Sequence, residues 1–424
     1  MSESKTAMAL IGATVAAGSA YFAYQRYEQR TAPPLPDSPV AVESSQEKAE
    51  RVQAAFAAAA AVEDAEVQSF IERLQAAVVA GDATAVGGMV SPGRMLDAVA
   101  ATSGEAIPPF VRSTLESQLR GELIEFFDAT VVETTIKRVD RDSEGNLVVY
   151  LRQVDHDRIL MKSRWWLVAE EGGLRWWDAE DLQLGLRVST MMAAGISSAM
   201  SGGDTSRLEA FIEVLSGLAD TDLRNAEEVR ILAARIDGLD LTGLPVSFRR
   251  LALVSRAALS TALGEPTDAL ARIDELEQQS LDPLELPVRH YQRAVSCLAL
   301  ERWDEAATAA QHYLDLLGED AEAYNLLGLA EAGRGNREAA MAAFDAGIAD
   351  DPQLPDNYAG VASIATDAAQ VAERLAKAPE LSVLDGAAGD LAAELDTEGL
   401  ARLLEAAKQA KPEWDSSTWD GSEG

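Results

Sequence analysis

Residues 321–354 read AEAYNLLGLAEAGRGNREAAMAAFDAGIADDPQL and specify how the second half of the chain folds. Two helical segments flank a glycine-containing break at 333–335, so the stretch predicts a helical hairpin. The hairpin carries small residues where two helices must approach, large rings that fill the space between hairpins, and a proline that ends the second helix. These residues are Leu327, Gly328 and Ala340, then Tyr324 and Phe344, then Pro352.

The spacing of these residues resembles the tetratricopeptide repeat. Thirty-four residues upstream, Ala306 corresponds to Ala340, and Ala294 corresponds to Gly328. The same interval downstream leads to Tyr358, which opens a degenerate unit, and a looser unit surrounds 263–270. We therefore expect an all-α tetratricopeptide-type solenoid over 204–379, closed by capping helices over 380–412.

The resemblance implies a concave groove that binds a peptide or a partner helix. First-helix residues would line it, and the same side chains would serve equally well in packing between repeats: Tyr291, Val295, Leu298, Asn325 and Leu329. No lysine occurs between Lys162 and Lys377, so the carboxylate clamp of chaperone-binding relatives lacks its usual residues. Arg289 and Arg293 are the nearest substitutes, and the acidic solenoid favours an apolar or basic ligand.

An α+β domain is expected over 64–190. Apolar residues at helical spacing begin at Val67 and Phe70, and further helix is expected at about 110–127. Four runs of alternating β-type residues then follow, separated by short turns, and they predict an antiparallel meander. Helices followed by such a sheet indicate that the helices cover one of its faces.

The last predicted hairpin mirrors itself around Gly172-Gly173, with Arg-Trp-Trp at 164–166 and again at 175–177. Strict alternation predicts Trp166 and Trp177 on one face and Trp165 and Trp176 on the other. On the Trp166 face we also expect Lys162, Arg164 and Asp181, and on the Trp165 face Met161 and Leu167. Packing explains all four indoles, and the alternative is that Trp166 and Trp177 line a ligand pocket.

This hairpin, ending near Asp178, and an opening helix ending in Val79-Ala80-Gly81-Asp82 resemble the nuclear-transport-factor-two-like cone fold. Members of that fold include enzymes, small-molecule binders and docking modules, so the resemblance selects no function. Its enzymes tend to carry an acid/base pair in the cone. The domain's one histidine, His156, lies in a predicted turn, so no catalytic pair is expected.

The amino end carries an uncharged run at 7–24 that is just long enough to span a bilayer as a helix. Basic and aromatic residues flank it, which favours a single-pass membrane anchor over 1–30 on an undecided side of the membrane. A cleaved signal peptide is the alternative. A Pro/Ala-rich stalk is expected over 31–63, and an acidic tail over 413–424.

The composition of the chain argues against several classes of function. Across 424 residues, 36 Lys plus Arg stand against 70 Asp plus Glu, and a net charge of -34 argues against a nucleic-acid partner. One cysteine, Cys297, and three histidines supply too few ligands for a zinc cluster, so no metal or cofactor is expected. No catalytic motif occurs, and we expect no enzyme. Low lysine usage and high alanine suggest a bacterial source.

The sequence therefore predicts a mixed fold and a membrane-tethered scaffold that recruits a protein or peptide partner through a helical-repeat groove. The α+β domain would dock onto another protein or form a homodimer. The alternative function is small-molecule binding or hydrolysis in the cavity of that domain.

Overall fold

The computed structural model describes the chain between residues 62 and 414. Short gaps in that description fall at 63, 105–106, 108, 131–132, 155–159, 171, 183–184, 201–205, 222, 224, 243, 245, 279–285 and 394–396. The predicted anchor, the stalk, His156 and most of the acidic tail lie outside the described residues. Among the residues described, no helix combines the length and apolarity needed to cross a membrane. The chain divides into two compact units, one covering 1–263 with 279–286 and the other 264–278 with 287–424.

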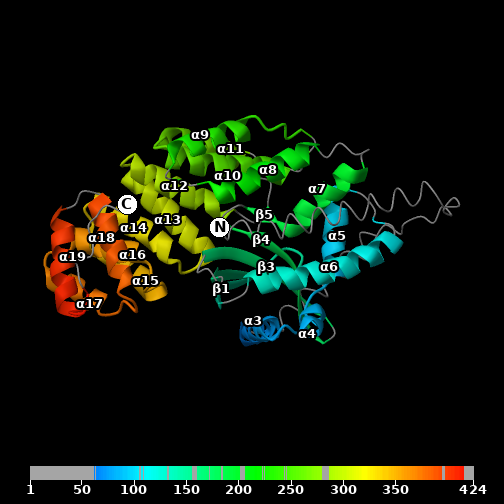
Figure 1. The fold of residues 1–424 in the computed structure, drawn as a ribbon, viewed down its shortest axis with the longest axis horizontal. Coiled ribbons are helices and arrows are strands. Elements are labelled where there is room, and N and C mark those ends of the chain that lie inside the picture. The colour runs from blue at the N-terminus through cyan, green and yellow to red at the C-terminus, as the bar shows by residue number, and fades with distance from the viewer. Residues whose placement is uncertain are drawn as a thin grey trace. The chain divides into compact units, whose positions relative to one another are not determined.

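Four helices open the described part of the first unit (Figure 1). They are α3 (Asp64–Val79), α4 (Ala83–Gly88), α5 (Pro92–Ser103) and α6 (Pro109–Thr130). The apolar face predicted for α3 is buried, including Val67 and Phe70 at 0% exposure. Local chemistry sets the helix ends: the Asp82 carboxylate accepts a hydrogen bond from the Ala85 N–H at the start of α4, and Gly104 ends α5 with a positive φ of 72°.

The sheet that follows is an antiparallel meander in the order β1-β2-β3-β4-β5, so the predicted mixed class and the predicted meander are confirmed. Its strands are β1 (Glu133–Arg141), β2 (Leu147–Val154), β3 (Leu160–Glu170), β4 (Gly173–Asp181) and the two-residue β5 (Leu186–Arg187). One face packs beneath the opening helices. There the rings of Trp165 and Trp176 meet Phe127 of α6 edge to face, at centroid distances of 5.5 and 5.2 Å.

Four more helices complete the described part of the first unit: α7 (Val188–Met200), α8 (Ser206–Asp220), α9 (Ala226–Asp237) and α10 (Val246–Ala262). Helix α7 is apolar on two sides. Met192 joins the core between the sheet and the opening helices, whereas Met191 packs with Phe211 of α8 and Phe248 of α10. Helices α8 to α10 fall in the same compact unit as the sheet, and the assignment of 204–262 to the repeats stays a prediction.

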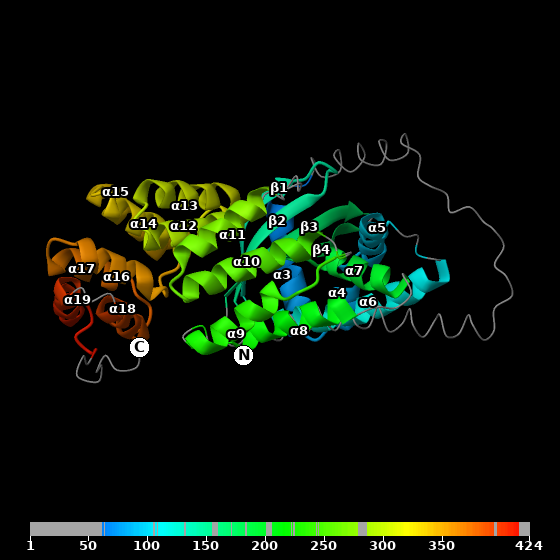
Figure 2. The same cartoon turned by 90° about the horizontal axis from the view of Figure 1, so that it is seen from above.

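The described part of the second unit is entirely helical (Figures 1 and 2). Its helices are α11 (Pro266–Gln278), α12 (Pro287–Ala299), α13 (Trp303–Leu317), α14 (Ala321–Gly333), α15 (Arg337–Asp350), α16 (Pro355–Ile364), α17 (Ala368–Leu375), α18 (Ser382–Ala393) and α19 (Thr397–Ala410). Hairpin partners such as α12 with α13 pack closely, and α14 also packs on α12 and on α16. The first helices of successive hairpins therefore form one layer.

Small residues permit this close packing. Ala306 and Ala340 are completely buried. A Cβ built at Gly328 would lie 2.4 Å from Phe344 Cε1, and one at Gly360 would lie 2.3 Å from the same atom. The ring of Phe344 thus fits between α14 and α16 because both helices present glycine to it.

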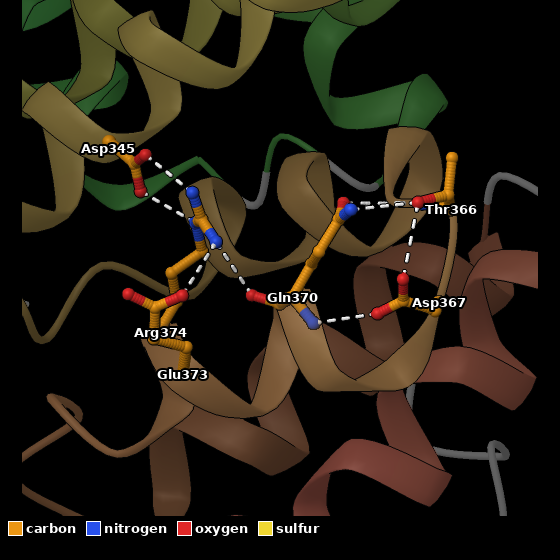
Figure 3. Close-up of polar contacts among 6 residues, drawn as sticks. All are labelled: Asp345, Thr366, Asp367, Gln370, Glu373 and Arg374. Atoms are coloured by element: carbon orange, nitrogen blue, oxygen red, sulfur yellow. Dashed lines mark hydrogen bonds and ion pairs between the residues drawn. The ribbon is translucent and has the colours of Figure 1, made fainter.

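Polar contacts fasten the end of the array (Figure 3). The Arg374 guanidinium on α17 donates two hydrogen bonds of 2.7 Å to the Asp345 carboxylate on α15. Asp367 caps α17 by accepting a hydrogen bond from the Gln370 N–H. Trp414, which the sequence assigned to the acidic tail, is instead 93% buried among α16 to α19, and its indole N–H donates to Asp385 at 2.9 Å.

Candidate partner-binding surface

Three predicted groove residues share one face of α12. Tyr291, Val295 and Leu298 follow at intervals of four and three residues and are half-buried. All three pack against a small-residue core formed by α12, α13 and α14, and the Tyr291 ring lies 5.5 Å from that of Tyr313. Each side chain therefore contributes to packing while part of its surface stays accessible.

The two predicted groove residues on α14 differ from each other. Leu329 is half-buried and packs against the core of the later hairpins, whereas Asn325 is only 8% exposed. Within the described residues, the Asn325 side chain makes no hydrogen bond. An amide that lacks an internal partner favours a ligand or solvent contact.

Basic residues on α12 border this surface. Arg293 donates to Asp274 at 2.7 Å and to Glu277 at 2.9 Å, both on α11. Burial opposes its charge, but these two carboxylates outweigh burial and raise the pKa of Arg293. Burial, followed by repulsion from Arg293, lowers the pKa of Arg289 despite the attraction of Glu277. The substitutes that the sequence offered for a carboxylate clamp are therefore engaged or partly buried.

Two potentially reactive side chains of this hairpin, His290 and Cys297, are buried. His290 is 7% exposed and lies 5.3 Å from His312, ring centroid to centroid. Burial, then the charges of Arg289 and His312, lowers the pKa of His290 to about 4, so it is neutral at pH 7. Burial raises the pKa of the Cys297 thiol, which disfavours the nucleophilic thiolate. In the described part of the chain, no group of three or more histidine, cysteine or acidic side chains could hold a metal ion.

The second candidate site, at Trp166 and Trp177, is a stack of rings and guanidinium groups. The two indoles are 1% and 4% exposed. The Arg187 guanidinium carbon lies 3.9 Å from the Trp166 ring centroid and 5.1 Å from that of Trp177. Arg164 contacts the Trp166 ring at 5.3 Å, and Arg94 the Trp177 ring at 5.4 Å. Cation–π packing thus fills the surroundings of both rings.

Two carboxylates are buried beside this stack, and each is paired with an arginine. Glu180 accepts from Arg164 Nε at 2.7 Å. Asp178 is fully buried and accepts from Arg187 Nε at 2.5 Å and from the Ser189 hydroxyl at 2.6 Å. Buried carboxylates held in ion pairs in this way serve poorly as general acids or bases.

A β-bulge decides which residues belong to this face. Trp166 pairs with Asp178 and Leu167 with Trp176, so Trp177 is left over in β4. Asp181 therefore pairs with Ser163 and lies on the Trp165 face, and the prediction that it shares a face with Trp166 is wrong. The face of Asp178 was missed for the same reason, because nothing in the local sequence marks the bulge. Arg187 and Ser189 were missed because their contacts with Asp178 come from elements that follow the predicted sheet, β5 and α7.

Comparisons with known proteins add no family. The chain matches no protein-family model, and the comparisons with curated proteins and solved structures return no significant match. A functional conclusion therefore depends on the chain's own residues.

Proposed function

We propose that this chain is a protein-interaction scaffold whose tetratricopeptide-type hairpins recruit a protein or peptide partner, with residues 7–24 tethering it to a membrane. The observation that carries the proposal is the row of Tyr291, Val295 and Leu298 on α12. These side chains stay half-accessible, whereas neighbouring Ala294 is completely buried. An accessible row of apolar and aromatic side chains on a rigid helix is a common anchor for partner helices.

The packing of the array supports the same proposal. Gly328, Gly360 and Phe344 bring first helices of successive hairpins together, and this layer would present a continuous surface. Rigid presentation lowers the entropy cost of binding. The tether rests on the sequence of 7–24 alone.

The alternative function, ligand binding or hydrolysis beside Trp166 and Trp177, has less support. Both indoles are stacked against guanidinium groups, and the neighbouring Asp178 and Glu180 are each engaged by arginine. An acid or base for hydrolysis would have to be freed from its ion pair first.

Affinity capture from gently solubilised membranes tests the scaffold proposal. The full chain is compared with a groove variant, Tyr291→Asn/Val295→Thr/Leu298→Gln. A matched control, Thr308→Ala/Gln311→Ala, alters two exposed residues on the second helix of the same hairpin. We expect one set of proteins to be captured by the full chain and the control and lost from the groove variant, with all three showing similar melting temperatures. If the groove variant captures the same proteins as the full chain, the proposal that this surface binds the partner is refuted.

Deletion of residues 1–30 tests the tether separately. We expect the full chain to sediment with membranes and the shortened chain to stay in the supernatant after carbonate washing. Equal sedimentation of both would refute an anchor at 7–24.

A further inference from the structure

The turns between α12 and α13 and between α14 and α15 border an open depression of about 470 Å³. It lies at the turn edge of the hairpins, and none of the five predicted groove residues lines it. Its walls combine an indole ring with charged and amide side chains. They are Glu301, Arg302, Trp303, Asp304, Glu305, Arg334 and Asn336.

The Trp303 ring forms a fixed wall of this depression. A Cβ built at Gly333 would lie 2.3 Å from Trp303 Cδ2, so the ring rests directly on the backbone of α14. Trp303 is only half-buried. Its indole N–H makes no hydrogen bond in the part of the chain that the structure describes. The ring therefore offers both a π face and an unused donor at the start of α13.

The charges around the ring do not balance. Arg302 Nε donates to Glu305 at 2.7 Å. Arg334 contacts two carboxylates, Asp304 at 2.9 Å and Glu331 at 2.6 Å. Glu301 has no ion pair among the described residues. Three carboxylates, Glu301, Asp304 and Glu305, line the depression against two guanidinium groups, so the lining carries one net negative charge beside an indole.

The backbone at Glu301 has an unusual conformation. Its φ of 57° lies in the left-handed region, and no other non-glycine residue of the described chain has a positive φ. Thirty-four residues later the corresponding turn has Gly335 at φ 79°. The next residues, Arg302 and Asn336, share φ −86° and ψ 64°. The same turn is therefore built with glycine, and its geometry does not require a carboxylate at Glu301.

We propose that this depression binds a cationic side chain, arginine or lysine, of a basic partner segment. The cation would lie against the Trp303 ring, with the Glu301 carboxylate as its counter-charge. Aromatic rings beside carboxylates attract guanidinium and ammonium groups through cation–π and ionic contacts. This site is separate from the α12 surface, so a partner could engage either one alone.

Indole N–H spectra of the full chain, labelled with ¹⁵N-tryptophan, test the proposal. The signal of Trp303 is assigned by its loss in Trp303→Phe. The probe is the peptide acetyl-(Arg-Gly)₃-amide, and its neutral counterpart carries citrulline in place of arginine. We expect the arginine peptide to shift the Trp303 signal in a saturable, salt-sensitive manner and the citrulline peptide to leave it unchanged.

Two variants locate the counter-charge. Glu301→Gly removes the carboxylate and introduces the residue found at the corresponding position, Gly335, of the next hairpin. We therefore expect the fold to be retained and the affinity for the arginine peptide to fall about fivefold. Glu338→Gln changes an exposed carboxylate at the start of α15; it is the matched control and should bind like the unaltered chain. Equal binding of both peptides, or an unchanged affinity in Glu301→Gly, would overturn the proposal. The groove variant should bind the arginine peptide normally, which separates this site from the scaffold function.

Discussion

The ring of Phe344 is confined between glycines on two neighbouring helices. We therefore expect Gly328→Ala to destabilise the chain while the ring is present and to stabilise it once the ring has been removed. In the unaltered chain, the new Cβ of Gly328→Ala would lie 2.4 Å from the ring. The ring has little room to retreat, because it is completely buried and Gly360 on α16 approaches the same ring atoms as closely. Overpacking of this kind costs about 1–3 kcal/mol, against a helix-propensity gain of about 0.5–1 kcal/mol. The net expectation is a loss of about 1–2 kcal/mol.

Removal of the ring reverses the expectation. Phe344→Ala alone should cost about 3–5 kcal/mol, since the side chain is completely buried. In that background, Gly328→Ala meets no ring and should stabilise by about 0.5–1 kcal/mol through helix propensity. The two substitutions are thus expected to be strongly coupled.

Hydrogen exchange measures this coupling without assuming that the whole chain unfolds in one step. Opening free energies of peptides from α14 and α16 are compared in the four members of the cycle. Gly389→Ala is the matched control, because a Cβ there meets no atom within 4 Å and should stabilise α18 in both backgrounds. If Gly328→Ala has the same effect with and without the Phe344 ring, the packing argument is refuted.

Three further predictions concern other parts of the chain. Arg164→Met should lower the free energy of unfolding by about 3–5 kcal/mol, because it leaves the buried Glu180 carboxylate without its ion-pair partner. Arg164→Met/Glu180→Leu should recover most of that stability in thermal melts, and an equal loss in both variants would contradict this explanation. The pKa of His290 is about 4 when folded and near 6.5 when unfolded, so stability should fall as the pH drops from 6.5 towards 4, and His290→Asn should flatten that part of the profile. Trp414→Ala should lower the free energy of unfolding by about 3 kcal/mol, because the ring is buried and its N–H is hydrogen-bonded; an unchanged thermal melt would contradict this.

Helical and strand periods were enough to predict the mixed class of this chain. The spacing of Val67 and Phe70 identified the buried face of α3, and the alternating runs identified an antiparallel meander. These features are local, because burial of one apolar stripe imposes the period of the element that carries it. The fixed interval between Ala306 and Ala340 likewise pointed to repeated hairpins, and both residues are completely buried.

Contacts between distant elements do not follow from these periods. Phe211 of α8 and Phe248 of α10 pack with Met191 of α7, and α8 to α10 belong to the compact unit that contains the sheet. Trp414 lies in a polar stretch, but the core of the last four helices buries its ring. Neither outcome is encoded in spacing, because both depend on which apolar surfaces fit together.

The sequence by itself determined the kinds of element, their order and the small residues at helix crossings. The tertiary structure decided which side chains meet. A bulge at Trp177 placed Asp178 opposite Trp166 and moved Asp181 to the other face. A left-handed turn at Glu301 brought a carboxylate to the wall that Trp303 forms. Periods repeat over a few residues and can be followed along the chain. A one-residue shift in pairing, or the meeting of two turns, is set by packing between segments far apart in sequence.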